Sequence, residues 1–389
     1  MPHFHIQDTA FDTPLSVGSA GLTVQSSPRP YRVDFLSSQP LGATINRAIA
    51  EAAHPIVLAD RRVVETHLSS CAALAKAPAL IAEATEDFKT LDGVMRLVAL
   101  LKEHNATRSS MLFAIGGGII QDVAAFACSM YKRGIPWTFA PSTLLAQGDS
   151  CLGGKTGLNH FNTKNLLGLF SAPRRVIIHT GFLATLERED LLSGLGEVFR
   201  LCVTGGGEFV DLMERLLPAA LAAEPEALTR LIEASLSVKR AVVERDEFEI
   251  DLRRSMNLGH SVGHAFEAIS RHGIPHGIGV TVGILVENEI SFRRGLLSEA
   301  DRQRLLALGS QLIPPRSRAA LAGLRLGDIL NVLRSDKKTE GSTLKLVVLE
   351  RIGTIRFIDL VLDDGAVAVL EAALARVLEA LNGQYRSAA

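Results

Sequence analysis

Short apolar runs alternate with helical periods along the first half of the chain. Runs such as "PIVLAD" (55–60) are continuous and of strand length, which is typical of strands buried on both faces of a parallel sheet. Apolar residues that recur every three to four positions, as in 119–134, predict helices, and Gly134 is a typical helix terminator. The alternation predicts a parallel, Rossmann-like α/β domain, with strands at 55–60, 110–118, 136–145 and 174–180 and helices at 90–106 and 119–134.

The pattern changes near residue 187, after which helical periods dominate and the one good strand candidate is "TLKLVVLERIG" (343–353). Residues 1–38 mix Ser, Pro and Gly, and we expect an extended lead-in with a short strand or two. The sequence therefore predicts an α/β domain over 1–187 and a mostly helical domain over 188–389. The predicted helices of the second half are 208–223, 225–247, 256–272, 278–294, 299–309 and 366–382.

Composition narrows the class of protein. Lys plus Arg is 41 and Asp plus Glu is 42, so the net charge is -1, and neither a nucleic-acid partner nor a membrane surface is indicated. The four cysteines are far apart and form no CxxC pair, as expected of reduced thiols. The first residues lack a signal-peptide pattern, and no apolar stretch approaches membrane-spanning length. We expect a cytoplasmic enzyme.

A glycine turn, "GGGIIQD" (116–122), joins a predicted buried strand to a predicted helix. Glycines let the backbone approach a pyrophosphate, and a helix N-terminus offers free N–H groups. The GxGxxG spacing is absent, so an ordinary tight turn explains the pattern equally well. Asp60, at the end of an early strand, favours the nucleotide interpretation, because a carboxylate there can accept the hydroxyls of a ribose.

A second glycine-rich segment, "GDSCLGGKTGLNH" (148–160), resembles a phosphate-binding P-loop, but Asp149 stands where the first glycine should be. A carboxylate there would repel phosphate, so we exclude the P-loop. The segment instead predicts a turn that places Asp149 and Lys155 in one cleft, with Lys164 and Asn165 close by.

The stretch "NLGHSVGHAFEAISRHGIPHG" (257–277) holds four of the eleven histidines. His260 and His264 are four residues apart and share a helix face, and His276 follows a turn at 273–275. His272 is interpreted as an ordinary histidine, either solvated or satisfied by hydrogen bonds, and not as a ligand. A catalytic zinc site has three protein ligands and an open position; HExxH is absent, so a carboxylate must come from elsewhere. Glu197, in an apolar helix, is the best candidate, because a carboxylate buried there is costly unless it is paired or binds a metal.

Basic residues near these motifs can clamp a substrate that carries carboxylate and phosphate groups. Considered one at a time, each basic residue is explained equally well as a charged side chain on the solvated face of a helix. The candidates are Lys239, Arg253, Lys337 and Lys338.

Taken together and in this order, the motifs resemble the 3-dehydroquinate synthase family of sugar phosphate cyclases, from about residue 55 to 355. The resemblance implies an NAD-binding α/β domain, a helical domain that holds Zn²⁺ or Co²⁺, and a homodimer. It implies that Glu197, His260 and His276 bind the metal, and that His264 serves catalysis or substrate binding instead.

The resemblance also assigns the remaining site residues. Arg133 matches an arginine that family dimers lend to the neighbouring subunit, and Arg200 stands where the family typically has Lys. The other substrate-site positions are Asp149, Lys155, Asn165, Lys239, Arg253, Asn257 and the pair Lys337 and Lys338. The implied NAD site comprises Asp60, Glu86, Lys89, Gly117, Gly118, Asp122, Thr143 and Lys164.

The family reaction oxidises a secondary alcohol of a seven-carbon sugar phosphate with NAD⁺, eliminates phosphate, returns the hydride and closes a carbocycle. The enzyme is therefore a lyase with no net redox change. Lys239 and Arg253 match the positions that hold the substrate carboxylate, which favours 3-deoxy-arabino-heptulosonate 7-phosphate. Departures from the family pattern favour a specialised cyclase that acts on sedoheptulose 7-phosphate or another sugar phosphate; they include Arg200, Gln121 for Gly, and Ile278 for Glu.

Two hypotheses of other kinds remain. A polyol dehydrogenase would share the architecture but needs no phosphate clamp, so Asn165, Asn257 and the lysine pair count against it. A non-catalytic relative would need no open metal site, which the set of Glu197, His260 and His276 argues against.

Overall fold

The computed structural model describes residues 1–18, 21–161, 163–270, 273–335, 339–340 and 343–386. Contacts divide the chain into two compact units, which are described separately. The α/β unit comprises residues 16–186 and 222–236, and the helical unit comprises residues 1–15, 187–221 and 237–389. Within the described residues, no helix combines the length and the apolar character needed to cross a lipid bilayer.

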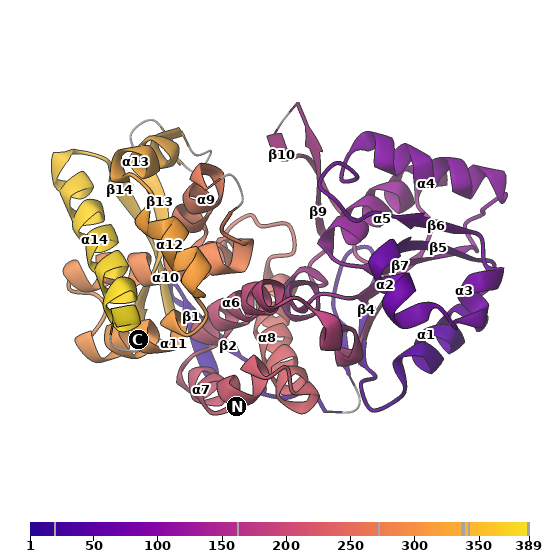
Figure 1. Cartoon of the computed structure of the whole chain (residues 1–389), viewed down its shortest axis with the longest axis horizontal. Helices are drawn as coiled ribbons and strands as arrows, with labels where there is room; N and C mark the ends of the chain where they lie inside the picture. The colour runs from indigo at the N-terminus through magenta and orange to yellow at the C-terminus, as the bar shows by residue number, and fades with distance from the viewer. Residues whose placement is uncertain (19–20, 162, 271–272, 336–338, 341–342, 387–389) are drawn as a thin grey trace. The chain divides into compact units, whose positions relative to one another are not determined.

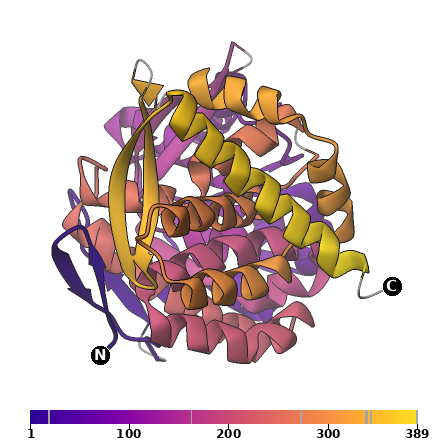
Figure 2. The ribbon, with the colours of Figure 1, turned by 90° about the vertical axis from the view of Figure 1, so that its left-hand side faces the viewer.

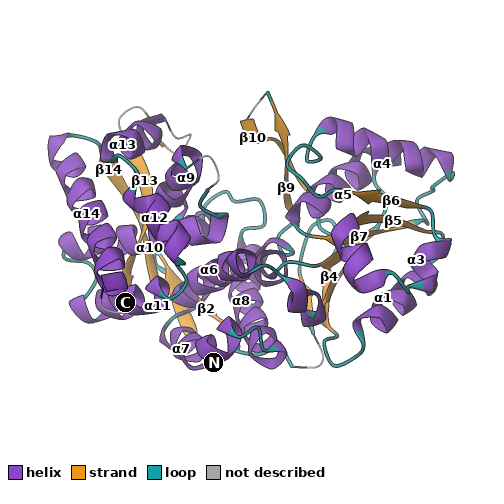
Figure 3. Ribbon diagram, viewed as in Figure 1, coloured by secondary structure: helices purple, strands orange, loops and turns teal. Residues whose placement is uncertain are grey.

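The α/β unit is built on a seven-stranded sheet with the strand order β3-β4-β11-β8-β7-β5-β6. Figures 1 and 3 label its strands β4, β5, β6 and β7. Every neighbouring pair is parallel except β3 and β4. Its strands are β3 (Leu22–Val24), β4 (Tyr31–Phe35), β5 (Pro55–Asp60), β6 (Ala79–Ala82), β7 (Met111–Gly116), β8 (Trp137–Pro141) and β11 (Arg175–Ile178). The helices are α1 (Leu41–Ala50), α2 (Arg61–Val63), α3 (Ala72–Lys76), α4 (Leu91–Glu103) and α5 (Gly118–Met130), with short helical turns at Val64–Leu68, Tyr131–Arg133, Ala146–Ser150 and Thr180–Thr185.

The sheet forms because its central strands bury both faces. Phe113 and Ile115 of β7 pack in one cluster with Val57 and Ala59 of β5, and Ile49 of α1 covers them. The four predicted strands and two predicted helices of this half are all present. An antiparallel hairpin, β9 (Lys155–His160) and β10 (Thr163–Phe170), stands outside the sheet and was not predicted.

One predicted boundary was wrong. The helix predicted to run to Gly134 ends at Met130 as α5, and a single 3-10 turn, Tyr131–Arg133, follows it. Lys132, Arg133 and Gly134 have positive φ angles of 50°, 61° and 115°. A left-handed backbone is costly for residues with a side chain, so the turn is strained.

The helical unit is organised around α10 (His276–Arg293), which is buried along nearly its whole length. Two glycines let other helices approach it: a Cβ on Gly277 would lie 1.8 Å from the Ser193 carbonyl oxygen, and one on Gly283 would lie 1.9 Å from that of Gly259. Figure 2 shows α14 as the long yellow helix in front of the others. The other helices are α6 (Arg188–Gly205), α7 (Gly207–Leu221), α8 (Pro225–Arg245, which begins in the α/β unit), η5 (Leu252–Asn257), α9 (His260–Ile269), α11 (Glu299–Ser310), α12 (Pro315–Ala322), α13 (Leu326–Ser335) and α14 (Asp364–Arg386).

The helical unit also contains a five-stranded sheet, in the order β12-β13-β14-β1-β2. The sequence predicted a single strand at 343–353 in this half; the structure has a hairpin, β13 (Thr343–Arg351) and β14 (Thr354–Val361), preceded by β12 (Thr339–Glu340). The sequence placed residues 1–15 in the first domain, but β1 (His3–Ile6) pairs in parallel with β14, and β2 (Thr9–Asp12) pairs with β1. The alternating burial of Phe4, Ile6 and Phe11 explains this placement, because one face of these strands must be covered.

Candidate metal centre and dinucleotide site

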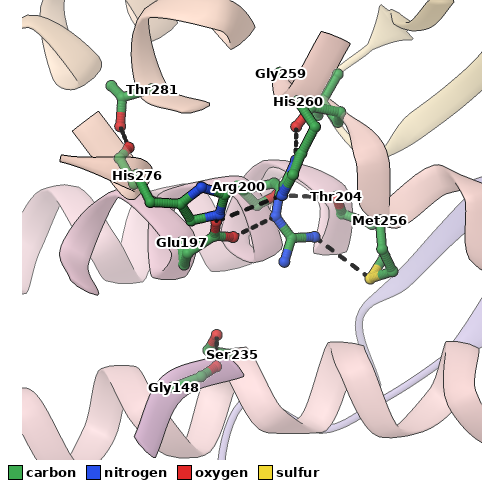
Figure 4. A network of polar contacts seen from close by, with 12 residues as sticks. Gly148, Glu197, Arg200, Thr204, Ser235, Met256, Gly259, His260, His276 and Thr281 are labelled. Carbon is green, nitrogen blue, oxygen red and sulfur yellow. Dashed lines mark hydrogen bonds and ion pairs between the residues drawn. The ribbon is translucent and has the colours of Figure 1, made fainter. Parts of the chain in front are cut away.

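A buried carboxylate, Glu197 of α6, forms the centre of the polar cluster in the helical unit (Figure 4). Its side chain is 1% exposed; Oε1 lies 3.1 Å from Nε2 of His276 and 3.6 Å from Nε2 of His260. The other oxygen, Oε2, accepts a 2.6 Å hydrogen bond from Nε of Arg200, which is 2% exposed. Arg200 therefore engages one carboxylate oxygen and leaves the other directed at two histidines.

The three histidines come from two neighbouring helix N-termini. His260 is the first residue of α9, His264 lies one turn further, and His276 is the first residue of α10. Their ligating nitrogens lie within 4.8 Å of one another. Tetrahedral zinc with bonds of about 2.0–2.1 Å needs ligand atoms about 3.3 Å apart, so the distances from Glu197 fit a metal ion. His264, the most exposed of the three, joins the cluster as well.

Hydrogen bonds fix the orientation of both candidate histidine ligands. Nδ1 of His260 donates to the carbonyl oxygen of Leu258 (3.2 Å), and Nδ1 of His276 donates to Oε1 of Glu267 (2.6 Å). With Nδ1 held in this way, a bound metal would take the place of any proton on Nε2, and each ring would then offer it the lone pair of Nε2. Sequence reasoning missed Glu267, although it lies seven residues after His260 on the same helix, a spacing that indicates a shared face.

The pKa values follow from burial and pairing. Burial is the largest influence on Glu197 and disfavours its charge, but Arg200 and the two histidines outweigh it and hold the pKa of Glu197 well below its usual range. Burial lowers the pKa of His260. For His276 burial also acts downward, but hydrogen bonds to Glu197 and Glu267 raise its pKa to about 10.

The loop between α8 and α9 carries two of the predicted substrate residues. The carboxylate of Asp246 accepts backbone N–H groups from Ile250, Asp251 and Arg253 at 2.8–2.9 Å. Burial raises the pKa of Asp246, but those N–H groups lower it by more. Asp246 thus closes the loop around buried Arg253, a role that the sequence did not reveal.

Three further predicted positions belong to this unit. Asn257 donates through Nδ2 to Oε1 of Glu249 (3.2 Å), and Lys239 is buried on α8. Ile278 is fully buried in α10, so this position presents no carboxylate to the cluster. Lys337 and Lys338 lie outside the described residues.

In the α/β unit, the predicted dinucleotide residues gather at the carboxyl ends of the strands. Asp60 ends β5 and its Oδ1 accepts the Arg62 N–H (3.1 Å), while Gly117 caps α5 with no side-chain hydrogen bond. A Cβ on Gly117 would lie 3.1 Å from Cγ2 of Thr143, whereas Gly118 has open space beside it. The uncapped N-terminus of α5 fits a pyrophosphate.

The charged residues predicted for the dinucleotide are paired with one another. Nζ of Lys89 lies 2.7 Å from Oδ2 of Asp122, and their side chains are 13% and 14% exposed. Nζ of Lys164 lies 3.3 Å from Oε1 of Glu86, at 43% and 51% exposure. Burial raises the pKa of Glu86, but a hydrogen bond from Asn159 (2.6 Å) and the nearby lysines lower it overall.

Asp149, Lys155 and Asn165 lie on the segments that follow β8. Asp149 is half-buried in the turn Ala146–Ser150, Lys155 is exposed at the start of β9, and Asn165 lies on β10 with a positive φ of 52°. Their convergence in one cleft stays a prediction. Arg133 is exposed near the start of β8, so it lies at the opposite edge of the sheet from Asp60 and Gly117.

Comparisons with known proteins agree with this arrangement. The family model described as 3-dehydroquinate synthase N-terminal matches residues 79–193, and its C-terminal counterpart matches residues 194–339. A 3-dehydroquinate synthase of Acidithiobacillus ferrooxidans is 36% identical over 304 residues, which cover 77% of this chain and 83% of the relative.

Two solved structures share the fold. A 2-deoxy-scyllo-inosose synthase in complex with carbaglucose-6-phosphate, NAD⁺ and Co²⁺ has a TM-score of 0.79 at 24% identity, covering 92% of this chain and 99% of its own. A 2-epi-5-epi-valiolone synthase from Streptomyces hygroscopicus with NAD⁺ and Zn²⁺ bound has a TM-score of 0.75 at 26% identity, covering 90% and 97%.

Proposed function

Because the chain belongs to the 3-dehydroquinate synthase family, we propose that it is an NAD⁺- and metal-dependent sugar phosphate cyclase. It eliminates phosphate from a seven-carbon sugar phosphate and forms a carbocycle, in the cytoplasm. The observation that carries the proposal is the buried Glu197 carboxylate, which faces Nε2 of both His260 and His276.

Glu197, His260 and His276 would hold Zn²⁺ or Co²⁺. A metal held there would supply Lewis acidity toward a substrate alcohol, and NAD⁺ would supply a hydride acceptor. Arg200 fixes one oxygen of Glu197, so that the carboxylate offers the metal the other. His264 is the exposed histidine of the cluster, and its proposed role is to move a proton to or from a substrate hydroxyl.

Buried basic residues support a substrate with a carboxylate. Arg253 and Lys239 are both buried, and Arg253 donates through Nη1 to the carbonyl oxygen of Glu247. The positive charges of the two side chains favour an anionic group on the substrate. Asn257 donates its amide N–H to Glu249, which leaves its Oδ1 to accept a hydroxyl. We therefore propose 3-deoxy-arabino-heptulosonate 7-phosphate as the substrate, with phosphate held by Asn165 and the lysine pair Lys337 and Lys338.

A homodimer is part of the proposal. Arg133 is exposed at the strand-start edge of the sheet, across from the dinucleotide residues. Its positive φ of 61° is the kind of strain that persists at functional positions. An arginine placed there is poorly sited for its own unit's dinucleotide edge and suits a neighbouring subunit.

A specialised cyclase is the second candidate. Arg200, Gln121 and Ile278 differ from the residues typical of the family, and the two solved structures named above are of a 2-deoxy-scyllo-inosose synthase and a 2-epi-5-epi-valiolone synthase. This candidate predicts turnover of sedoheptulose 7-phosphate or glucose 6-phosphate rather than the heptulosonate.

The test is a phosphate-release assay with metal-loaded protein and NAD⁺, offered the three sugar phosphates in parallel, with NADH absorbance recorded. Release from the heptulosonate with constant NADH is the expected result. Release only from another sugar phosphate would support the specialised cyclase. Net NADH accumulation without phosphate release would overturn both and favour a dehydrogenase.

A further inference from the structure

The turn that carries Asp149 is held from several sides. Gln147 donates through Nε2 to the carbonyl oxygens of Pro141 (2.9 Å) and His179 (3.0 Å). The carbonyl oxygen of Gly148 accepts a 2.7 Å hydrogen bond from Oγ of Ser235 on α8 (Figure 4). The residues before Asp149 are therefore fixed by buried side chains.

The residue after Asp149 is fixed by Gln121. Nε2 of Gln121 donates to the Ser150 carbonyl oxygen at 2.7 Å, and Oγ of Ser150 donates back to Oε1 of Gln121 at 2.7 Å. Gln121 is buried on α5, and its amide uses both its donor and its acceptor on one residue. Glycine, the residue typical of the family here, has no side chain to make either bond.

Asp122, the next residue of α5, binds the other end of the segment that follows Asp149. Oδ1 of Asp122 accepts the Gly157 N–H (3.3 Å), and the Asp122 carbonyl oxygen accepts Oγ1 of Thr156 (3.2 Å). Two consecutive residues of α5, Gln121 and Asp122, thus form hydrogen bonds with both ends of the segment 150–157. The N-terminus of this helix is the proposed pyrophosphate site.

We propose that Gln121 is a positioning residue that sets the place of the Asp149 carboxylate relative to the NAD⁺-binding end of α5. The inference rests on the proposed function only in that Asp149 contacts the substrate. Without Gln121, Ser150 loses two hydrogen bonds and the turn gains freedom where the substrate hydroxyls must be aligned. A misplacement of about 1 Å can cost on the order of a hundredfold in rate.

The test compares Gln121→Met, which keeps the length but neither hydrogen bond, with Gln121→Gly and Ser150→Ala. Ser129→Ala is the matched control, because Ser129 lies on the same helix and its hydroxyl donates to the carbonyl oxygen of Ala125 in that helix. Hydrogen exchange of residues 146–152 measures the turn without reference to activity. Steady-state kinetics and NAD⁺ titration measure the consequence.

In Gln121→Met we expect faster exchange of the Cys151 and Leu152 amides, whose bonds to Ala146 and Asp149 close the turn. We expect kcat to fall about 10- to 100-fold, while KM for the sugar phosphate and Kd for NAD⁺ change by less than about threefold. The loss of kcat in Gln121→Gly should equal or exceed that in Gln121→Met. The loss in Ser150→Ala should be smaller. Adding Ser150→Ala to Gln121→Met should change kcat little further, because the two residues share one interaction.

Unchanged exchange and unchanged kcat in Gln121→Met would overturn the inference. Parallel losses of NAD⁺ binding, thermal stability and kcat would overturn it too, because Gln121 would then support the fold as a whole. If the wild-type protein releases phosphate from no sugar phosphate, the proposed function fails, and the exchange result alone decides whether Gln121 fixes the turn.

Discussion

The carboxylates of the two units are stabilised in different ways. Glu197 in the helical unit is almost fully buried, with Arg200 on one oxygen and two histidines facing the other. Asp122 and Glu86 in the α/β unit are more exposed and each has its own lysine. A buried charge must be compensated inside the protein, whereas an exposed one shares the task with water. The cluster around Glu197 should therefore depend on a metal ion, whereas the lysine pairs of Asp122 and Glu86 should not.

The largest effect should come from Glu197→Gln. Removing the charge should lower turnover by at least about a thousandfold, because a bound metal contributes several kcal/mol of charge stabilisation. Metal content after dialysis, measured by mass spectrometry, should fall in parallel. Glu189→Gln is the control, because Glu189 lies on the same helix and pairs with the exposed Arg316 at 3.5 Å.

The Gln substitution also leaves Arg200 buried without its counter-charge, which costs stability. Glu197→Gln combined with Arg200→Met should therefore recover thermal stability without recovering metal or activity. Full metal content in Glu197→Gln would contradict the assignment of this residue as a ligand.

Substitution of Arg200 should have the next largest effect. Arg200→Met should weaken metal affinity about 10- to 100-fold, the usual cost of losing a group that orients a ligand. Arg200→Lys keeps the charge but not the planar guanidinium, so its loss should be smaller. Competition with a chelator measures both, and equal affinities in wild type and Arg200→Met would show that Arg200 does not orient Glu197.

Glu267 tests the other side of the cluster. Glu267→Ala removes the acceptor for Nδ1 of His276 and should weaken metal affinity about tenfold. Glu267→Gln retains a carbonyl oxygen at the same place and should lose less. The same chelator competition ranks them; a larger loss in the Gln variant would mean that the charge of Glu267, rather than its hydrogen bond, matters.

The smallest effects belong to the α/β unit, where the lysines differ in exposure. Lys89→Met should lower the free energy of unfolding by about 1–3 kcal/mol, because it leaves Asp122, whose side chain is only 14% exposed, without its charged partner. Lys164→Met should change it by less than about 1 kcal/mol, as is usual for exposed pairs. Urea denaturation compares them, and metal affinity should be unchanged in both. A metal-binding defect in either variant would break the contrast between the units.

Burial explains which elements the sequence revealed. The strand predicted at 55–60 matches β5 to the residue, because strands buried on both faces are continuous apolar runs. β6 has only four residues and is mostly half-buried, and β10 is largely exposed, so neither has a clear apolar pattern. The position of β1 depends on pairing with a strand at the other end of the chain, which no local pattern can show.

The site was predictable where its residues lie close in sequence. The spacing of His260, His264 and His276 indicated one cluster, and the apolar surroundings of Glu197 indicated a buried carboxylate. Glu267 looks like an ordinary acidic residue on a helix, and its contact with His276 appears only in three dimensions. Gln121 was visible as a departure from the family, but its partner, Ser150, was not.

The pairing of β1 with β14 also limits when the N-terminal strands can pair during synthesis of the chain. His5 pairs with Thr354, so on the ribosome the first strand leaves the exit tunnel long before its partner is made. At about 5–20 residues per second, the wait is roughly 20 to 70 s. During that time Phe4, Ile6 and Phe11 have no sheet to cover them, while strands β3 to β11 of the α/β unit can already pair. We expect a nascent chain to expose β1 and β2 to chaperones until β14 has left the exit tunnel.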